Sequence, residues 1–493
     1  MGVKTGETSL GSKTATGVFW NFFEMMGRQG IGILVTLFLA RFLAPRDFGL
    51  VAMLSVFFAI ANALMDVGFR QALIRKKDVT SADYSTMFFT NLGLGFVAYC
   101  LLFISAPFIA VFYNEPRLVV LARAVGVVVI INSFQLVQVV DLTRRMDFKT
   151  QFKVTIPAGV ISGIAAITMA YKGFGVWSLA TQMILSPLLI TVSLWRVNSW
   201  RPTREFSTGS FRGLFGFGSK LFLSGLLDIV FRNIYVVVIA KLFTASITGY
   251  YFFATKVRDA ILHQLSGSIQ KVTYPALSSI QDDGERLKKG YRQVVQATTY
   301  IIFPAMVFLG VLARPLFEVF LQPKWFPGIP YLQILCISGL VYPMHLVNLN
   351  MLQVKGRSDL FLYLEILKKI LIVFVLIISV RFGIWGLLWG QVFTSFVAYL
   401  PNSYFSAKLI GYGPFEQLKD VLPALFGSVL AGGVIFFLGR LGADLPLALV
   451  LLILQTLAGA IVYLVAGMVM KLKIQSLLWG VLKDRIPWRK SAQ

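Results

Sequence analysis

Long apolar runs dominate this chain of 493 residues. A helix needs about 20 mostly apolar residues to cross the hydrocarbon core of a bilayer. Hydrophobic residues make up 57% of the sequence and its mean hydropathy is +0.75, which is more apolar surface than a water-soluble fold can cover. The sequence therefore predicts an all-α polytopic membrane protein with about 14 transmembrane helices. The expected spans are 18–40, 48–69, 85–111, 118–140, 154–171, 174–195, 214–238, 246–268, 293–313, 329–352, 360–380, 384–406, 421–439 and 445–470.

The positions of Lys and Arg orient these spans. If the N-terminus is cytoplasmic, 29 of the 46 Lys and Arg residues lie in cytoplasmic tails and loops, and nine lie on the opposite side. Cytoplasmic loops of membrane proteins carry such an excess. We therefore expect a multi-pass protein with cytoplasmic N- and C-termini. The net charge of +24 belongs to these loops, and no nucleic acid is expected as a partner.

Two motifs recur along the chain. Residues 40–50 match residues 240–250, with Gly49 matching Gly249 at an offset of 200, and residues 175–179 match residues 383–387 at an offset of 208. Matches in the same order predict an N-lobe of six helices in residues 1–205 and a C-lobe of six helices in residues 206–408. A pseudo-twofold axis along the membrane normal would relate the lobes, as in transporters built from parallel repeats. Residues 409–470 add helices 13 and 14, and residues 471–493 form a basic amphipathic cytoplasmic tail.

Enzyme chemistry finds little support in the sequence. The two cysteines and two histidines show no metal-ligand spacing, and no glycine-rich phosphate loop is present. A membrane polymerase would need an acidic site in a sizeable loop on the far side, where acidic residues are few and scattered. An acyltransferase that uses His263 or His345 is a further alternative, but a lone histidine in a span is more often a packed residue. We expect neither a cofactor nor a metal.

Charged residues inside the spans are the candidate functional residues. Such residues usually face a bundle interior or a water-filled cavity and mark a substrate or ion pathway. Three acid–arginine pairs spaced four residues apart, one helical turn, lie in the first, second and seventh spans. The candidates for substrate binding are Arg28, Arg70, Lys220, Arg232, Lys256 and Arg258; those for ion coupling or charge pairing are Glu24, Asp66, Asp228 and Asp259. The alternatives are snorkelling to the membrane surface for Arg70 and Lys220, and buried structural ion pairs for the others.

Several stretches resemble one known family. The stretches are Leu39–Met53, Asp66–Phe69, Ala72–Ile74, Gly173–Leu179, Gly249–Tyr251, Ser278–Asp283, Gln333–Cys336 and Lys355–Leu360. They are similar to polysaccharide exporters of the Wzx and teichuronic-acid exporter type, within the multidrug/oligosaccharidyl-lipid/polysaccharide exporter superfamily. The resemblance covers nearly the whole chain.

This resemblance implies a V-shaped pair of six-helix lobes around a cationic cavity, in a bacterial inner membrane. It also implies a flippase, not an enzyme, that moves an undecaprenyl-diphosphate-linked oligosaccharide from the cytoplasmic to the outer leaflet by alternating access. The expected partners are the lipid-linked oligosaccharide and membrane lipids, with a polysaccharide polymerase and glycosyltransferases as candidate protein partners. The alternative transporter is a small-molecule exporter of the MATE kind, which the basic span residues disfavour because drug cations prefer acidic cavities.

Overall fold

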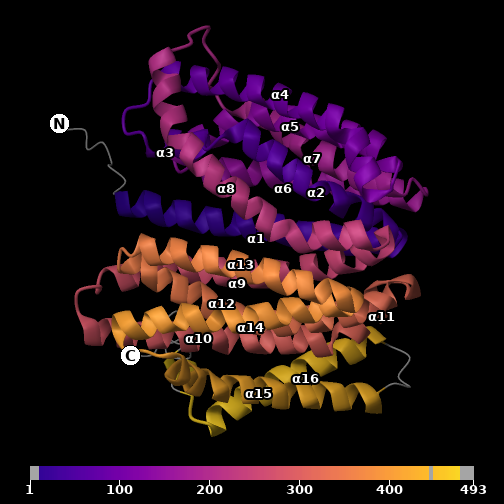
Figure 1. Ribbon diagram of the computed structural model, residues 1–493, viewed down its shortest axis with the longest axis vertical. Helices are drawn as coiled ribbons and strands as arrows, with labels where there is room; N and C mark the ends of the chain where they lie inside the picture. Colours follow the sequence, from indigo (N-terminus) through magenta and orange to yellow (C-terminus); the bar gives the residue numbers. More distant parts are fainter. Residues whose placement is uncertain (1–9, 443–447, 473, 478–493) are drawn as a thin grey trace, which may run out of the picture. The chain divides into compact units, whose positions relative to one another are not determined.

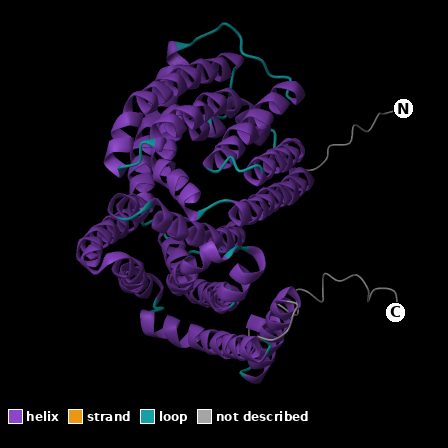
Figure 2. Ribbon diagram, turned by 90° about the vertical axis from the view of Figure 1, so that its right-hand side faces the viewer, coloured by secondary structure: helices purple, strands orange, loops and turns teal. Residues whose placement is uncertain are grey.

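A computed structural model describes residues 10–442, 448–472 and 474–477, without the side chains of residues 10–19 and 263–272. Helices fill nearly all of this part of the chain and no strand occurs in it (Figure 2). Twelve segments of it are long and apolar enough to cross a membrane. One of these, Ser358–Ile410, contains two helices, and the helix Ala245–Ser278 is not among the twelve, so the count of 14 is not confirmed. The expected class, an all-α polytopic membrane protein, is confirmed.

The chain divides into two units, Met1–Phe252 and Phe253–Gln493. In the first unit, α4 packs along α5, α1 packs along α6, and α2 packs on both α4 and α8 (Figure 1). Because α8 packs on α2, α3 and α4, it belongs to this unit, and the lobe boundary at residues 205/206 remains a prediction. The helices are α1 (Leu10–Phe42), α2 (Pro45–Asp66), α3 (Phe69–Arg75), α4 (Ser81–Tyr113), α5 (Arg117–Arg144), α6 (Phe148–Tyr171), α7 (Val176–Val197), α8 (Thr208–Leu242) and the start of α9 (Ala245–Ser278).

In the second unit, α12 packs on α10 and α14, while α15 packs on α10 and α16, and α16 also contacts α11 (Figure 1). The helices after α9 are α10 (Gly284–Val311), α11 (Ala313–Phe320), η1 (Pro323–Gly328), α12 (Ile329–Val354), α13 (Ser358–Ser379), η2 (Val380–Phe382), α14 (Gly383–Ile410), α15 (Pro414–Leu441) and α16 (Ala448–Val469). The expected helices 13 and 14 correspond to α15 and α16. Most of the expected amphipathic tail, from residue 478 on, lies outside the described residues.

Short polar motifs set the helix ends. Thr80 and Asp83 form a capping box at the start of α4, in which the Thr80 hydroxyl accepts from the Asp83 N–H at 3.2 Å and the Asp83 carboxylate accepts from the Thr80 N–H at 2.9 Å. These bonds satisfy backbone donors that a helix start leaves unpaired. Arg144, at the end of α5, donates to four carbonyls around the end of α3, those of Leu73, Ile74, Lys76 and Lys77.

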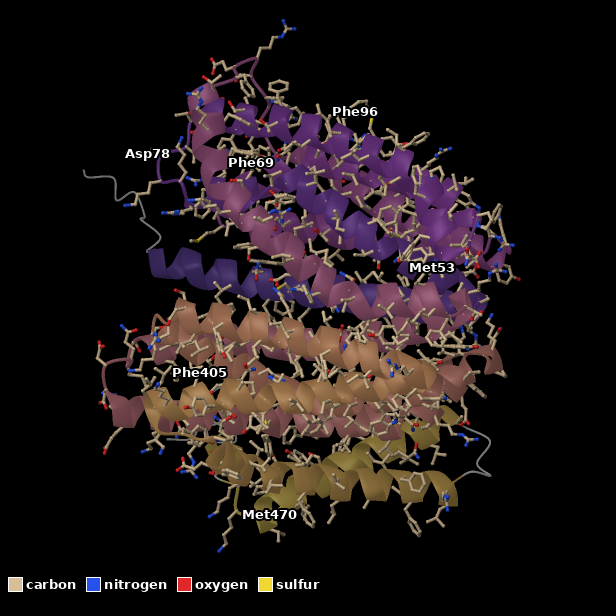
Figure 3. The ribbon with its side chains drawn as sticks, viewed as in Figure 1. Met53, Phe69, Asp78, Phe96, Phe405 and Met470 are labelled. Carbon is tan, nitrogen blue, oxygen red and sulfur yellow. The ribbon has the colours of Figure 1, made fainter. Side chains whose placement is uncertain are left out.

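A break between α2 and α3 separates residues expected in one span. Val67 and Gly68 both have positive φ, 43° and 74°, which ends α2 at Asp66. The predicted span 48–69 is therefore wrong at its C-terminal end. Phe69 begins α3 and its ring lies edge-on to the Phe211 ring of α8, with the centroids 6.3 Å apart (Figure 3).

A cluster of buried polar side chains joins α15 to the neighbouring helices of the second unit. The Asn348 Oδ1 atom on α12 accepts hydrogen bonds from the Tyr291 hydroxyl at 2.7 Å, the Ser406 hydroxyl at 2.6 Å and the Gln417 amide at 3.1 Å. These side chains come from four helices, α10, α12, α14 and α15. Next to the cluster, burial and then the hydrogen bond to Asp420 raise the pKa of Tyr412, in the α14–α15 loop, above its usual range.

Two glycines that the sequence repeat relates lie against each other in the first unit. A Cβ atom added at Gly49 on α2 would meet the Ala245 carbonyl oxygen at 1.7 Å, and one added at Gly249 on α9 would meet the Pro45 carbonyl oxygen at 1.8 Å. The contact is reciprocal, since each glycine faces the residue four positions before the other, at the same offset of 200. Only glycine permits this approach of two backbones.

Candidate functional site

The first acid–arginine pair lies on α1. The Arg28 Nε atom is 3.3 Å from the Glu24 carboxylate, so the expected ion pair forms along one helix face. The Arg28 side chain is 65% exposed, whereas that of Glu24 is 12% exposed. The guanidinium group therefore keeps most of its donors available for a further anion.

The second pair, Asp66 and Arg70, spans the break between α2 and α3. The Arg70 N–H donates to the Asp66 carboxylate at 3.0 Å, and the two charged groups approach to 3.9 Å. Asp66 thus accepts from an otherwise unpaired donor in the first turn of α3. The expectation that both residues share one continuous helix is wrong, but they do lie together. The Arg70 side chain is 45% exposed.

Three charged residues on α8 complete the candidates in the first unit. Lys220, Asp228 and Arg232 are all exposed on this helix of 35 residues. Asp228 and Arg232 lie four residues apart and so share one face of α8. Charges exposed along a span face a polar cavity or a membrane surface, because exposure to hydrocarbon is costly.

The sequence interpretation missed an uncharged polar chain inside the first unit. The Asn132 amide on α5 donates to Asn62 on α2 at 2.8 Å, and the Gln135 amide donates to Asn132 at 3.1 Å. The Thr191 hydroxyl of α7 lies 3.4 Å from the Gln135 carbonyl oxygen. Asn62 stands one helical turn before Asp66, so the polar chain and the second charged pair share a face of α2. Asn and Gln in apolar spans were the available signal.

In the second unit, Arg258 on α9 is held by neighbouring groups. Its Nε and Nη2 atoms lie 2.8 and 2.7 Å from the Asp259 carboxylate, and its Nη1 donates to the Ser338 hydroxyl of α12 at 3.1 Å. The Arg258 side chain is only 15% exposed. Lys256, two residues earlier, is exposed. Arg258 therefore joins α9 to α12, and Lys256 is the accessible cation of this pair.

His345 is held by hydrogen bonds at both of its ring nitrogens. The His345 Nε2 atom is 2.9 Å from the Ser395 carbonyl oxygen, and its Nδ1 atom is 2.8 Å from the Asn402 amide. A neutral ring that donates from Nε2 and accepts at Nδ1 satisfies both contacts. His345 is therefore a packed residue that joins α12 to α14. The side chain of His263 lies outside the described residues.

These features define a polytopic helical membrane transporter with charged and polar side chains inside its helices. A family profile described as polysaccharide biosynthesis protein matches residues 38–330, and the chain belongs to this family. The family match and the named relatives confirm the expected polysaccharide exporter type, a transporter and not an enzyme.

Relatives of known name are similar over most of the chain. The lipopolysaccharide biosynthesis protein WzxC of Escherichia coli is 26% identical over 75% of this chain and 76% of its own. The succinoglycan biosynthesis transport protein ExoT of Rhizobium meliloti is 24% identical over 93% of both chains. The teichuronic acid biosynthesis protein TuaB of Bacillus subtilis is 25% identical over 62% of this chain and 63% of its own.

Solved structures share the fold. The lipid II flippase MurJ in an inward closed conformation superposes with a TM-score of 0.69 at 15% identity, over 92% of this chain and 98% of its own. An inward-facing multidrug resistance MATE family transporter superposes with a TM-score of 0.60 at 19% identity, over 77% of this chain and 95% of its own. At these identities the likeness concerns the fold alone.

Proposed function

We propose that this protein is a flippase that moves an undecaprenyl-diphosphate-linked oligosaccharide repeat unit across a bacterial inner membrane, for the biosynthesis of a surface polysaccharide. The names of the relatives support this reading, since they concern lipopolysaccharide, succinoglycan and teichuronic acid biosynthesis. The excess of Lys and Arg on one side supports cytoplasmic N- and C-termini, and hence loading from the cytoplasmic leaflet. A polysaccharide polymerase and glycosyltransferases are the proposed protein partners.

The observation that carries the proposal is the set of basic side chains within the long helices. A diphosphate brings anionic oxygens into the membrane, and guanidinium groups bind such oxygens in pairs. Arg28 and Arg70, each more than 40% exposed, and Lys256, which is also exposed, are accessible members of this set. The remaining proposed contacts are Lys220, Arg232 and Arg258. The polar chain from Asn62 to Thr191 offers amides of the kind that hydrogen-bond sugar hydroxyls.

The acidic residues give the proposed site a second state. Glu24 pairs with Arg28 and Asp259 with Arg258 in this structure. A diphosphate that binds one of these arginines would displace the acidic side chain paired with it. The released carboxylate could then bind a coupling proton or sodium ion. Asp66 and Asp228 are proposed to act in the same way. Exchange of one anion for another at the same arginine is the step that links substrate binding to alternating access.

The test is transport by the purified protein in vesicles, with a fluorescent undecaprenyl-diphosphate-oligosaccharide whose glycan is accessible to a membrane-impermeant enzyme only on the outside. We expect Arg28→Ala, and separately Lys256→Ala with Arg258→Ala, to lower the flipping rate by about tenfold or more, as expected for loss of charge-assisted hydrogen bonds. Arg381→Ala, at an exposed position in η2, is the matched control and should flip at the wild-type rate. Wild-type rates in all variants would refute the proposed site.

The same vesicles separate this function from its alternative. A MATE-like exporter would accumulate organic cations and leave the lipid-linked oligosaccharide where it was loaded. Absence of any flipping by the wild-type protein, in vesicles where cation transport is measured, would replace the proposed function with this one.

A further inference from the structure

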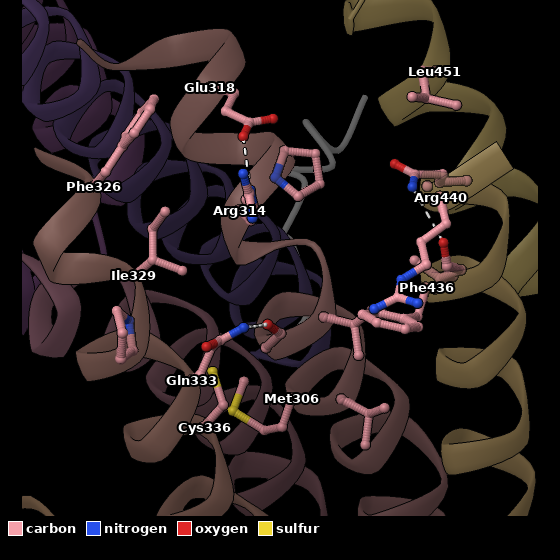
Figure 4. Close-up of a pocket in the computed structure, with 18 of the residues that line it drawn as sticks. Met306, Arg314, Glu318, Phe326, Ile329, Gln333, Cys336, Phe436, Arg440 and Leu451 are labelled. Atoms are coloured by element: carbon pink, nitrogen blue, oxygen red, sulfur yellow. Dashed lines mark hydrogen bonds and ion pairs between the residues drawn. The ribbon is translucent and has the colours of Figure 1, made fainter. Parts of the chain in front are cut away.

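A cavity of about 1290 Å³ lies within the second unit, between α10, α11 and α12 on one side and α15 and α16 on the other (Figure 4). Its size exceeds the ~300–1,000 Å³ of typical small-molecule sites. Most of its wall is apolar, and the apolar lining includes Met306, Val307, Ile337, Leu340, Ile435 and Leu451. An apolar wall of this extent fits hydrocarbon chains.

Two glycines mark close helix contacts at the edge of the cavity. A Cβ added at Gly432 of α15 would lie 2.7 Å from Val307 of α10, and one added at Gly459 of α16 would lie 2.4 Å from Ile435 of α15. The three helices are therefore pressed together at these points. The cavity continues beyond these contacts, and its lining there includes the small residues Gly310, Gly439 and Ala448.

The rim of the cavity is basic. Arg314 on α11 and Arg440 on α15 reach it from opposite sides (Figure 4). The Arg314 guanidinium is 2.9 Å from the Glu318 carboxylate, yet its side chain is 76% exposed. The Arg440 guanidinium lies over the Phe436 ring, 5.1 Å from the centroid, and among the described residues no carboxylate pairs with it. Two exposed guanidinium groups above an apolar cavity match an anionic head group above hydrocarbon chains.

A polar group in the wall also points to a ligand. Gln455 of α16 is 3% exposed and lines the cavity. Its Nε2 atom donates to the Ile435 carbonyl at 3.1 Å, but its Oε1 atom is buried and has no hydrogen-bond partner among the described residues. Gln455 lies seven residues into α16, about 10 Å below the helix start at 1.5 Å per residue. An unpaired amide oxygen at this depth accepts a hydrogen bond from a donor on a ligand or from a water molecule in the cavity.

We propose that this cavity binds an anionic phospholipid of the outer leaflet, with the phosphate held by Arg314 and Arg440 and the acyl chains against α10, α12 and α15. The outer leaflet follows from the proposed cytoplasmic termini. The flanking surfaces of α15 and α16 carry exposed apolar side chains, including Phe436, Phe437 and Leu441, so the site opens toward membrane lipid.

The site is distinct from the proposed substrate residues. Ser338 of α12 bonds to Arg258, whereas Ile337 and Leu340 of the same helix line the cavity. A lipid seated there therefore packs against the helix that positions Arg258. The phospholipid thereby sets the position of α12, and its binding does not depend on which substrate is flipped.

The test measures lipid binding and needs no transport. The purified full-length protein is exchanged into detergent with phosphatidylglycerol or phosphatidylcholine, and retained lipid is measured by native mass spectrometry together with the thermal unfolding midpoint. We expect wild-type protein to retain phosphatidylglycerol in preference and to gain thermal stability from it. Arg314→Gln with Arg440→Gln should weaken this binding about tenfold, as expected for lost charged hydrogen bonds. Arg381→Gln removes the same charge at an exposed site outside the cavity and should bind like wild type.

Two further variants keep the test decisive if the double variant does not fold. Glu318→Gln removes the carboxylate that competes for Arg314 and should tighten phosphatidylglycerol binding severalfold. Leu451→Trp fills the cavity without changing charge and should lower retention of the lipid. Equal retention of phosphatidylcholine, unchanged binding in these variants, or preferential retention of undecaprenyl phosphate added in competition would overturn the proposal.

Discussion

The reciprocal glycine contact between α2 and α9 gives the sharpest prediction for stability. In Gly49→Ala the new methyl group would stand 1.7 Å from a backbone oxygen, and Cβ atoms essentially never approach closer than 3.0 Å, so the two backbones must separate by about 1.3 Å. No rotamer change relieves the clash, because both partners are backbone. In Gly249→Ala the contact of 1.8 Å requires a separation of about 1.2 Å.

The expected cost follows from the geometry. Overpacking of a well-packed contact costs roughly 1–3 kcal/mol, and at about 2 °C per kcal/mol each single variant should unfold about 2–6 °C lower. The double variant is more informative. Because one separation of α2 from α9 relieves both clashes, Gly49→Ala with Gly249→Ala should cost about as much as one single variant and not the sum of two.

The assay is thermal unfolding in one detergent, followed by the fluorescence of a thiol-reactive dye on the two free cysteines, Cys100 and Cys336. Gly93→Ala in α4 is the matched control, since an added Cβ there meets nothing within 4 Å and should leave stability unchanged or slightly raised. Additive losses in the double variant would show that the two glycines act independently and would refute the reciprocal contact. Wild-type stability in both single variants would do the same.

Two further substitutions test contacts inside each unit. Asn348→Ala removes the acceptor shared by three buried donors and should cost roughly 2–5 kcal/mol, measured as a lower unfolding midpoint. The control Thr394→Val loses only a hydrogen bond within its own helix and should cost much less. Equal losses in the two variants would contradict the role of the polar cluster. Arg144→Gln removes the donor group at the end of α3 and should expose the α3–α4 loop to proteolysis while α5 itself stays protected; an unchanged cleavage pattern would contradict the proposed role of Arg144.

The sequence was sufficient for the features that follow a local or periodic pattern. Apolar runs of about 20 residues predicted the all-helical membrane fold, and the offset of 200 related Gly49 to Gly249 before any contact between them was known. The spacing of Glu24 and Arg28 also predicted their ion pair, because positions four apart must meet on a continuous helix.

Other features carry little or no local signal. Gly68 is a local signal for the end of α2, but the positive φ of Val67 is not, because a β-branched residue rarely takes positive φ. The hydrogen-bonded series of side chains from Asn62 to Thr191 joins three helices, and its ends are more than 100 residues apart in sequence. No spacing rule therefore connects its members. The engagement of Arg258 with Ser338 likewise depends on how α9 meets α12. Pairing across distant helices is set by packing, which periodicity does not describe.

The bonds from Arg144 to the carbonyls near Leu73 and Lys77 also order events during synthesis. The donor follows its acceptors by about 70 residues, which a ribosome adds in on the order of 10 s. Until α5 has emerged, the end of α3 has no partner for these carbonyls and they remain bonded to water. The loop between α3 and α4 can therefore reach its final form only after α5 is in place.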